Sequence, residues 1–343
     1  MKRPPHPPTV SVVIPAYNAA GYVGRAVASA LSQTLPPEQV VCVDDGSTDD
    51  TLERLHTLAE RFPEKVWVVQ QTNAGPSAAR NRGLERVTSE YVQFLDADDE
   101  LDPDKLERQT GLAGASPRPA DLVVSAYRMY DTDPTKTRLT PIADDEWVGL
   151  LTSRLGITSS NLCRTESVRR VGGWNEDRAT SEDPDLWFRL MQSGAVVVMD
   201  AEPRVTLWRR PESQWNSDLR RSLEGWVRLR GEVWAYLEEH GLNTDERRRK
   251  VEESAYKCLE SLAKRIGDRD ALTLVKRAGV PFFPHHRRFL HRLAFQAGGF
   301  WTVRMLKFLK TWILKGGPRP AVPASAHQVT LGGNGVSRPG GRR

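Results

Sequence analysis

The chain has 343 residues, of which 39% are hydrophobic, and a formal net charge of +5. This length can bury a substantial core and accommodates one large domain with an appendage, or two domains. No run reaches the ~18 apolar residues expected of a membrane-spanning helix. The three cysteines lie far apart, without the spacing of a disulfide framework or a zinc site, which favours a reducing compartment.

Charge is distributed unevenly along the chain. Carboxylates are concentrated in residues 44–104, whereas the last part of the chain is strongly basic. This asymmetry predicts a bound cation near the front of the chain and an anionic surface near its end. Residues 1–8 are basic and proline-rich, with no apolar core of a signal peptide, so we expect a cytoplasmic protein.

The first part of the sequence alternates strands with helices. Short apolar runs rich in β-branched residues predict buried strands at 10–15, 40–43, 66–69 and 90–95. Apolar residues at helical spacing predict helices at 19–34, from Ser47 or Thr48 to Phe62, and at 76–86. This order predicts an α/β domain with a mostly parallel sheet. Ligands bind such sheets outside the carboxyl ends of the strands, where the loops that follow the strands should meet.

The next part of the chain shows weaker patterns. The expected elements are a helix to about residue 112, a strand at 122–129, a surface excursion at 131–144, a short strand at 159–164, a helical turn at 166–171, a helix at 182–192 capped by Ser181, and strands at 196–198 and 204–208. We expect this domain to span residues 10–211, after a disordered lead-in at 1–9.

Residues 212–315 are expected to form a helical C-terminal region, and residues 316–343 a disordered tail. From residue 288 to 315 the chain is basic and amphipathic, which predicts a helix lying on an anionic membrane surface. The protein would then be peripheral on the cytoplasmic face. The alternative is a helix docked on the globular body with a solvated basic face. Bulky apolar residues interleave the basic ones, so no nucleic acid is expected as a partner.

Three carboxylates follow the strand at 90–95. Asp96 and Asp98 have the spacing to bind one hard divalent ion, Mg²⁺ or Mn²⁺, and Mg²⁺ usually takes one or two carboxylates plus substrate phosphates. Asp99 is better suited to a capping or supporting role. The alternative for the whole cluster is an aspartate-rich turn that caps the next helix.

Other polar residues follow the neighbouring strands. The Tyr17 ring could stack on a base, Asp44 could accept from a base N–H or a ribose hydroxyl, and Arg80 could pair with a phosphate or orient the acidic loops. No glycine-rich phosphate loop is present. These residues predict a nucleoside-diphosphate site. The candidate nucleotide-binding residues are Pro15, Tyr17, Asn18, Asp44, Asp45, Arg80 and Asp96.

A general base is needed to activate an acceptor. Glu182 and Asp183 at the start of a predicted helix are the best candidates, because a helix N-terminus favours an ionised carboxylate. The alternative is a capping box formed with Ser181, without any chemistry.

Five segments resemble, in order, the motifs of the family 2 glycosyltransferases. They are Val12–Asn18, Val43–Asp49, Asn73–Asn81, Phe94–Asp99 and Ser181–Leu190. The resemblance covers roughly residues 10–210. It implies a GT-A fold with a Rossmann-like sheet flanked by helices, a nucleotide-sugar donor (a UDP-sugar above all), a divalent metal and inversion at the anomeric carbon.

The resemblance also implies roles for the donor-site residues. Tyr17 and Asp44 correspond to contacts with the nucleobase, and Arg80 to an arginine of the nucleotide site. Asp98 corresponds to the principal carboxylate on the metal, and Asp96 completes the Asp-x-Asp motif.

For the acceptor side, the resemblance makes Asp183 the catalytic base, with Glu182 beside it. One departure concerns the segment after the last strand, where many members carry a histidine that closes over the diphosphate. Arg210 takes about that place here. It could contact the diphosphate, but the resemblance supports no metal contact at this position.

The expected function is therefore metal-dependent, inverting sugar transfer to a hydroxyl of a glycan or lipid-linked acceptor, of the cell-envelope polysaccharide type. One alternative is a nucleotidyltransferase, but the loop at 15–21 lacks the basic residues that would hold a triphosphate. Another is a nucleotide-sugar-binding scaffold without catalysis, against which the presence of both Asp98 and Asp183 argues.

Overall fold

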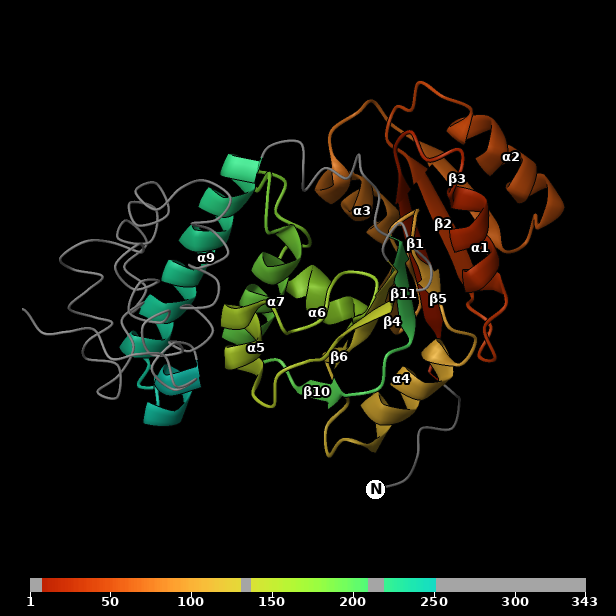
Figure 1. Cartoon of the computed structure of the whole chain (residues 1–343). Coiled ribbons are helices and arrows are strands. Elements are labelled where there is room, and N and C mark those ends of the chain that lie inside the picture. Colours follow the sequence, from red (N-terminus) through yellow and green to blue (C-terminus); the bar gives the residue numbers. More distant parts are fainter. Residues whose placement is uncertain (1–7, 131–136, 209–218, 251–343) are drawn as a thin grey trace, which may run out of the picture. The chain divides into compact units, whose positions relative to one another are not determined.

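The computed structural model describes residues 8–130, 137–208 and 219–250 (Figure 1). The strands are β1 Val10–Ala16, β2 Gln39–Asp44, β3 Val66–Gln70, β4 Tyr91–Phe94, β5 Glu100–Leu101, β6 Leu122–Ser125, β7 Tyr127–Tyr130, β8 Thr137–Thr140, β9 Leu162–Arg164, β10 Val197–Asp200 and β11 Val205–Trp208. The helices are α1 Val23–Leu31, α2 Thr51–Arg61, α3 Pro76–Leu84, α4 Lys105–Ala115, α5 Glu146–Thr152, α6 Thr165–Arg170, α7 Glu182–Gln192 and α9 Leu219–Glu239.

The described strands form a large sheet in the order β10-β6-β9-β4-β1-β2-β3. Every neighbouring pair in it is parallel except those that β9 makes, antiparallel, with β4 and β6. The predicted α/β fold with a mostly parallel sheet is therefore confirmed. The crossover helices cover both of its faces, and α3 lies opposite α1 and α2 across strands β1–β3 (Figure 1).

Successive side chains of a strand point to opposite faces of the large sheet, and a separate hydrophobic core lies on each face. In β1, Val12 and Ile14 are fully buried and pack with side chains of α1, α2 and α4. Val13, between them, is buried in the other cluster, which contains side chains of α3, α5, α6 and α7. Helix α3 approaches β1 so closely that a Cβ on Gly83 would lie 2.3 Å from a methyl group of Val13.

A small second sheet, in the order β5-β11-β7-β8, corrects two predictions. The strand predicted at 122–129 is two strands, because Ala126 separates β6 of the large sheet from β7 of the small one. The predicted surface excursion contains β8, which pairs antiparallel with β7. Strand β8 is mostly exposed and has no apolar face, so its sequence gave no strand signal. The short helix α5 was also missed.

Two predicted helix caps are wrong. Ser181 makes no side-chain capping bond at the start of α7 and has a left-handed backbone, with φ 64°. Helix α2 begins at Thr51, beyond Ser47 and Thr48, and the Asp49 carboxylate accepts a 3.0 Å hydrogen bond from the Thr51 amide. Ser47 and Thr48 instead bond to the loop that follows β1.

Helix α9 lies in the first part of the region predicted to be helical. Five of its apolar side chains are buried, namely Val227, Leu229, Val233, Trp234 and Leu237. Within the described residues, no helix is long and apolar enough to cross a membrane. Arg210, the basic amphipathic stretch at 288–315 and the tail at 316–343 lie outside the described residues.

Candidate active site

The loops after β1 and β2 meet at the carboxyl edge of the large sheet, as predicted. Ala16 and Asp44 are register partners at the ends of these strands. The Asn18 amide donates to Ser47 Oγ at 3.0 Å, and Asn18 Oδ1 accepts from the Thr48 amide at 2.8 Å. Asn18 itself is left-handed, with φ 47°. The first two predicted nucleotide loops thus form one hydrogen-bonded unit.

The two predicted nucleobase residues differ in exposure. The Tyr17 side chain is 46% exposed, so its ring face is accessible for stacking. Asp44 is fully buried, with Oδ2 accepting a 3.3 Å hydrogen bond from the Ser47 amide. Its Oδ1 has no partner among the described residues. A buried acceptor left unpaired costs about 1–3 kcal/mol, which a donor from a ligand would offset.

Both carboxylate oxygens of Asp45 accept hydrogen bonds from groups within the protein. Its Oδ1 accepts from Gln71 Nε2 at 2.8 Å and from the Ala74 amide at 2.9 Å, and its Oδ2 accepts from the Gly75 amide at 2.9 Å. These bonds hold the turn into α3, where Gly75 has φ 91°. The geometry gives Asp45 a positioning role in this loop.

Arg80 joins three parts of the site. Its side chain is buried, and Nη2 donates a 2.8 Å hydrogen bond to Asp96 Oδ1. Its guanidinium carbon lies 4.4 Å from the centre of the Trp174 ring. The Arg80 Nε atom has no partner among the described residues. Arg80 therefore orients the first aspartate of the cluster and retains a donor for a further oxygen atom.

The aspartate cluster is held by Ser159. The Ser159 hydroxyl donates to Asp99 at 2.6 Å and accepts from the Asp96 amide at 3.1 Å. Asp99 is buried, in agreement with the supporting role predicted for it. Asp98 is partly buried, and its backbone oxygen accepts from Arg25 at 3.1 Å.

Asp183 lies in the first turn of α7, within the electrostatic range of the same cluster. Burial, followed by the negative charge of Glu182, raises the pKa of the Asp183 carboxyl to about 7. The charge of Asp96 also raises this pKa, whereas that of Arg80 lowers it. The structure thus brings the predicted base next to the predicted phosphate-side residues, which come from a different part of the sequence.

Comparison with known proteins shows what the chain is similar to. Residues 11–171 match Glycosyl transferase family 2. This segment, a little under half of the chain, is similar to that family. The predicted GT-A-type fold is confirmed by the solved structure of Staphylococcus aureus TarS 1–349 in complex with UDP-GlcNAc. That structure aligns with a TM-score of 0.60 and 18% identity, covering 79% of each chain.

Curated relatives match part of the chain. TuaG of Bacillus subtilis (strain 168), a glycosyltransferase named for teichuronic acid biosynthesis, is 45% identical over 103 residues, which is 30% of this chain and 40% of TuaG. An uncharacterized glycosyltransferase of Haemophilus influenzae is 38% identical over 102 residues, 30% of this chain and 41% of the relative. This chain therefore aligns with less than half the length of either relative.

The candidate site offers few protein ligands for a metal. Among the described residues, no three or more His, Cys, Asp or Glu side chains are grouped as a metal site would require. Asp96 and Asp98 supply two carboxylates, and Asp96 is already paired with Arg80. Mg²⁺ usually takes one or two carboxylates and completes its shell with phosphate oxygens and water. The residues fit a metal shared with a diphosphate, but not a closed protein site.

Sequence reasoning missed the contacts that join α3 to the segment before α7. Asn81 Oδ1 accepts from the Trp174 amide at 2.8 Å, and Asn81 Nδ2 donates to the Trp174 carbonyl at 2.9 Å and to Glu176 at 2.7 Å. Gly173 makes this approach possible, because a Cβ there would lie 2.6 Å from Asn81 Oδ1. The available signal was Asn81 itself, next to Arg80 in the third motif.

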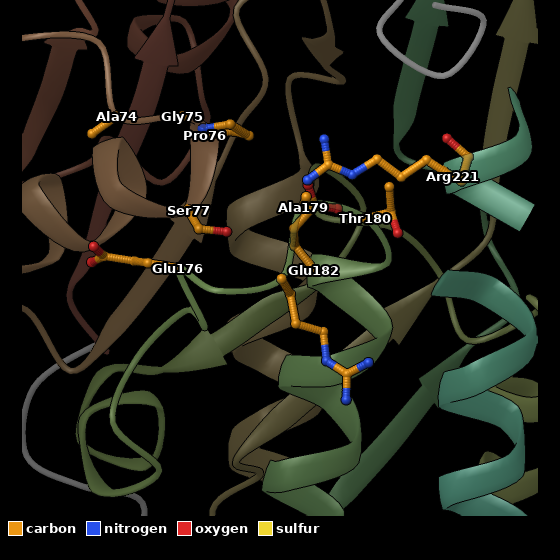
Figure 2. Close-up of a pocket in the computed structure, with 11 residues that line it drawn as sticks. Ala74, Gly75, Pro76, Ser77, Glu176, Ala179, Thr180, Glu182 and Arg221 are labelled. Atoms are coloured by element: carbon orange, nitrogen blue, oxygen red, sulfur yellow. The ribbon is translucent and has the colours of Figure 1, made fainter. Parts of the chain in front are cut away.

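A pocket of about 320 Å³ lies beside the predicted base (Figure 2). It is lined by residues 74–77 at the start of α3, by Arg221 and Ser222 of α9, and by five residues around the start of α7, namely Glu176, Arg178, Ala179, Thr180 and Glu182. The predicted nucleobase residues do not line it. The site therefore has a nucleotide edge on the sheet and a separate polar pocket next to Glu182.

Proposed function

We propose that this protein transfers a sugar from a nucleoside-diphosphate sugar to an acceptor hydroxyl, with inversion at the anomeric carbon. The observation that carries this proposal is the electrostatic coupling of Asp183 to Arg80 and Asp96. A carboxylate suited to general-base catalysis, within electrostatic range of residues suited to the donor diphosphate, supports the proposal.

The donor would lie along the sheet edge. Tyr17 is accessible for stacking on the base, and the unpaired Asp44 Oδ1 can accept from a base N–H. At the other end, Arg80 Nη2 is paired with Asp96, and Arg80 Nε, which has no partner among the described residues, could donate to a phosphate oxygen. A divalent metal held by Asp98 and Asp96 would neutralise the charge that develops on the departing diphosphate.

The acceptor would be activated by Asp183. Its carboxylate takes the proton of an acceptor hydroxyl, and the oxygen then forms a bond to the anomeric carbon. The bond from that carbon to the diphosphate breaks, and its electron pair leaves with the nucleoside diphosphate. A base works best when its pKa lies near the working pH, which the pKa of about 7 satisfies. Glu182 would stay beside Asp183 in the acceptor site.

We further propose a UDP-sugar donor and an acceptor of the cell-envelope polysaccharide type. The donor is supported by the fold shared with TarS, whose structure contains UDP-GlcNAc. The acceptor is supported by the similarity to TuaG, named for teichuronic acid biosynthesis. Membrane attachment through residues 288–315 stays a prediction of the sequence.

A donor screen tests this function. The full chain is incubated with a set of UDP-, GDP- and dTDP-sugars and either Mg²⁺ or Mn²⁺, and nucleoside diphosphate release is measured. We expect metal-dependent release from a UDP-sugar. Pyrophosphate release from a nucleoside triphosphate and a sugar phosphate would instead support a nucleotidyltransferase. Nucleotide-sugar binding without release under any condition would support a scaffold.

A further inference from the structure

A fully buried lysine lies in the core at the start of helix α4. Lys105 is the first residue of this helix, and its side chain has no exposed surface. Two carboxylates act on it electrostatically, but each is already paired with an arginine, Asp102 with Arg128 and Asp200 with Arg108. Lysine is almost never fully buried without a charged partner, so the hydrogen bonds of this one call for an explanation.

The Lys105 amine holds two buried glutamine side chains. Its Nζ atom donates to Gln93 Oε1 of β4 and, at 2.6 Å, to Gln109 Oε1 one turn further along α4. Both glutamines are fully buried. A glutamine amide has an oxygen acceptor on one side and an NH₂ donor on the other, and an N–H group of the amine can bond only to the oxygen. Lys105 therefore determines which way both amides point, with each NH₂ group turned away from it.

The two NH₂ groups reach the loop that precedes β9. Gln93 Nε2 donates to the Ser159 carbonyl at 2.9 Å, and Gln109 Nε2 donates to the Ser160 carbonyl at 2.9 Å. Both serines are fully buried. A glutamine turned the other way would place its oxygen against a carbonyl and leave buried groups unpaired, which is costly. The backbone of residues 159–160 is thus held from the core by the two oriented glutamines.

Ser159 connects this loop to the aspartate cluster. Its hydroxyl donates to Asp99 and accepts from the Asp96 amide, as described above. Every step from Lys105 to the Asp96 backbone is therefore a hydrogen bond between groups that are largely removed from water. Bonds in such a network support one another, so the loss of one member displaces the next.

We propose that Lys105 is a positioning residue for the metal and diphosphate site, acting through Gln93 and Ser159 on the loop that carries Asp96 and Asp98. The proposal rests on the proposed function, since it takes these two aspartates to hold the metal. Lys105 does not itself touch the substrate. A lysine that only filled the core would affect stability alone, whereas a positioning lysine also determines how well the site binds the metal.

The test measures how much Mn²⁺ is needed for UDP binding to the full chain. UDP affinity is measured by isothermal titration calorimetry at a series of Mn²⁺ concentrations and with EDTA. Lys105→Met keeps the length of the side chain and removes its N–H donors. We expect the Mn²⁺ concentration that gives half of the full effect to rise roughly tenfold, and UDP affinity in EDTA to stay within about twofold of wild type.

Two further variants follow the route of the effect. Gln93→Glu keeps an oxygen for Lys105 but cannot donate to the Ser159 carbonyl, so it should raise the Mn²⁺ requirement as Lys105→Met does. Lys105→Gln keeps N–H donors one bond nearer the backbone and should retain part of the wild-type response. These two variants also carry the test if Lys105→Met does not fold.

Leu106→Ala is the matched control for lost stability. Leu106 is the next residue of α4, is fully buried, and belongs to the apolar core on its face of the sheet. Its truncation should be strongly destabilising, yet it should leave the Mn²⁺ requirement unchanged. Circular dichroism at the assay temperature shows which variants are folded.

The outcomes separate this proposal from the proposed function. An unchanged Mn²⁺ requirement in Lys105→Met and Gln93→Glu, or an equal increase in Leu106→Ala, would overturn the positioning role alone. UDP binding by wild type that does not depend on Mn²⁺ would contradict the proposed metal site, and the positioning role with it.

Discussion

The guanidinium of Arg80 donates a 2.8 Å hydrogen bond to the carboxylate of Asp96, joining helix α3 to the aspartate cluster after β4. The ring of Trp174 also holds this arginine in position, because the Arg80 guanidinium lies over it. The position of the first aspartate of the cluster therefore depends on a buried arginine 16 residues earlier in the chain.

Removing this arginine should weaken nucleotide binding. Arg80→Met deletes a charge-assisted hydrogen bond to Asp96, an interaction worth about 1.5–3 kcal/mol, so we expect UDP affinity to fall by roughly tenfold or more. Isothermal titration calorimetry with UDP and Mn²⁺ measures the change. Arg82→Met is the control and should leave affinity unchanged, because Arg82 lies on the same helix and, within the described part of the chain, pairs only with the exposed Glu85. Wild-type affinity of Arg80→Met would contradict the assignment.

The pH profile of turnover should reflect Asp183. Its pKa is raised to about 7, and only the ionised carboxylate can take a proton, so kcat/KM should rise with pH and level off above about 7. Because the Glu182 charge raises this pKa, Glu182→Gln should move the rise to lower pH. A profile that is flat from pH 5.5 to 8.5 in wild type would argue against Asp183 as the base.

Buried Lys105 makes a separate pH prediction, for stability. It is fully buried, bonds to Gln93 and Gln109, and burial lowers the pKa of its amine from 10.5 to about 7. Between pH 7 and 10.5 the unfolded chain binds this proton and the folded chain does not, so Lys105 contributes a stability that rises with pH. The free energy of unfolding is measured with urea at pH 6.5 and 8.5. From the lower to the higher pH, it should rise less, or fall more, for Lys105→Met than for wild type. The same difference for both proteins would refute the shifted pKa.

Helix α9 should be sensitive to one added methyl group. A Cβ on Gly225 would lie 1.9 Å from the Thr180 hydroxyl, two residues before Glu182. Alanine normally stabilises a helix relative to glycine by about 0.5–1 kcal/mol, but here we expect Gly225→Ala to lower Tm and turnover. Gly114→Ala in α4, which meets no atom within 4 Å, should be neutral or stabilising. Equal behaviour of the two variants in thermal unfolding and activity assays would show that α9 is not packed closely here.

The sequence was sufficient for those parts of the fold that have strong local signals. Strands β1, β2 and β4 are apolar runs buried on both faces, and the edge strand β3 is an apolar run that is partly exposed. Their order with the helices determined the sheet. The separation of β6 from β7 escaped prediction because β7 pairs with β11, which lies far away in the sequence. Strand β8 escaped prediction because it has no apolar pattern of its own and is a strand through its pairing with β7. The sequence of β8 is polar and exposed, so only its pairing with β7 makes it a strand.

The candidate site, like the fold, has residues that the sequence predicted and residues that it did not. Asp96, Asp98 and Arg80 could be singled out because they follow strands or lie in a recognisable motif. Their supports could not be, because Ser159 and Trp174 reach them from parts of the chain more than sixty residues away and are ordinary residues in their local context. The sequence also did not predict that α9 lines the pocket, since the amphipathic pattern of this helix indicates only that one face is buried.

Asp183→Asn tests the central claim most directly. The variant keeps the shape of the side chain and removes the base, so turnover of the identified donor and acceptor should fall about 10²–10⁴-fold while UDP affinity stays within about twofold of wild type. Asp177→Asn, an exposed aspartate in the preceding loop, should keep full activity and serves as the control. Wild-type turnover of Asp183→Asn, or a loss of UDP affinity as large as the loss of turnover, would contradict the account of Asp183 as the base of a glycosyl transfer.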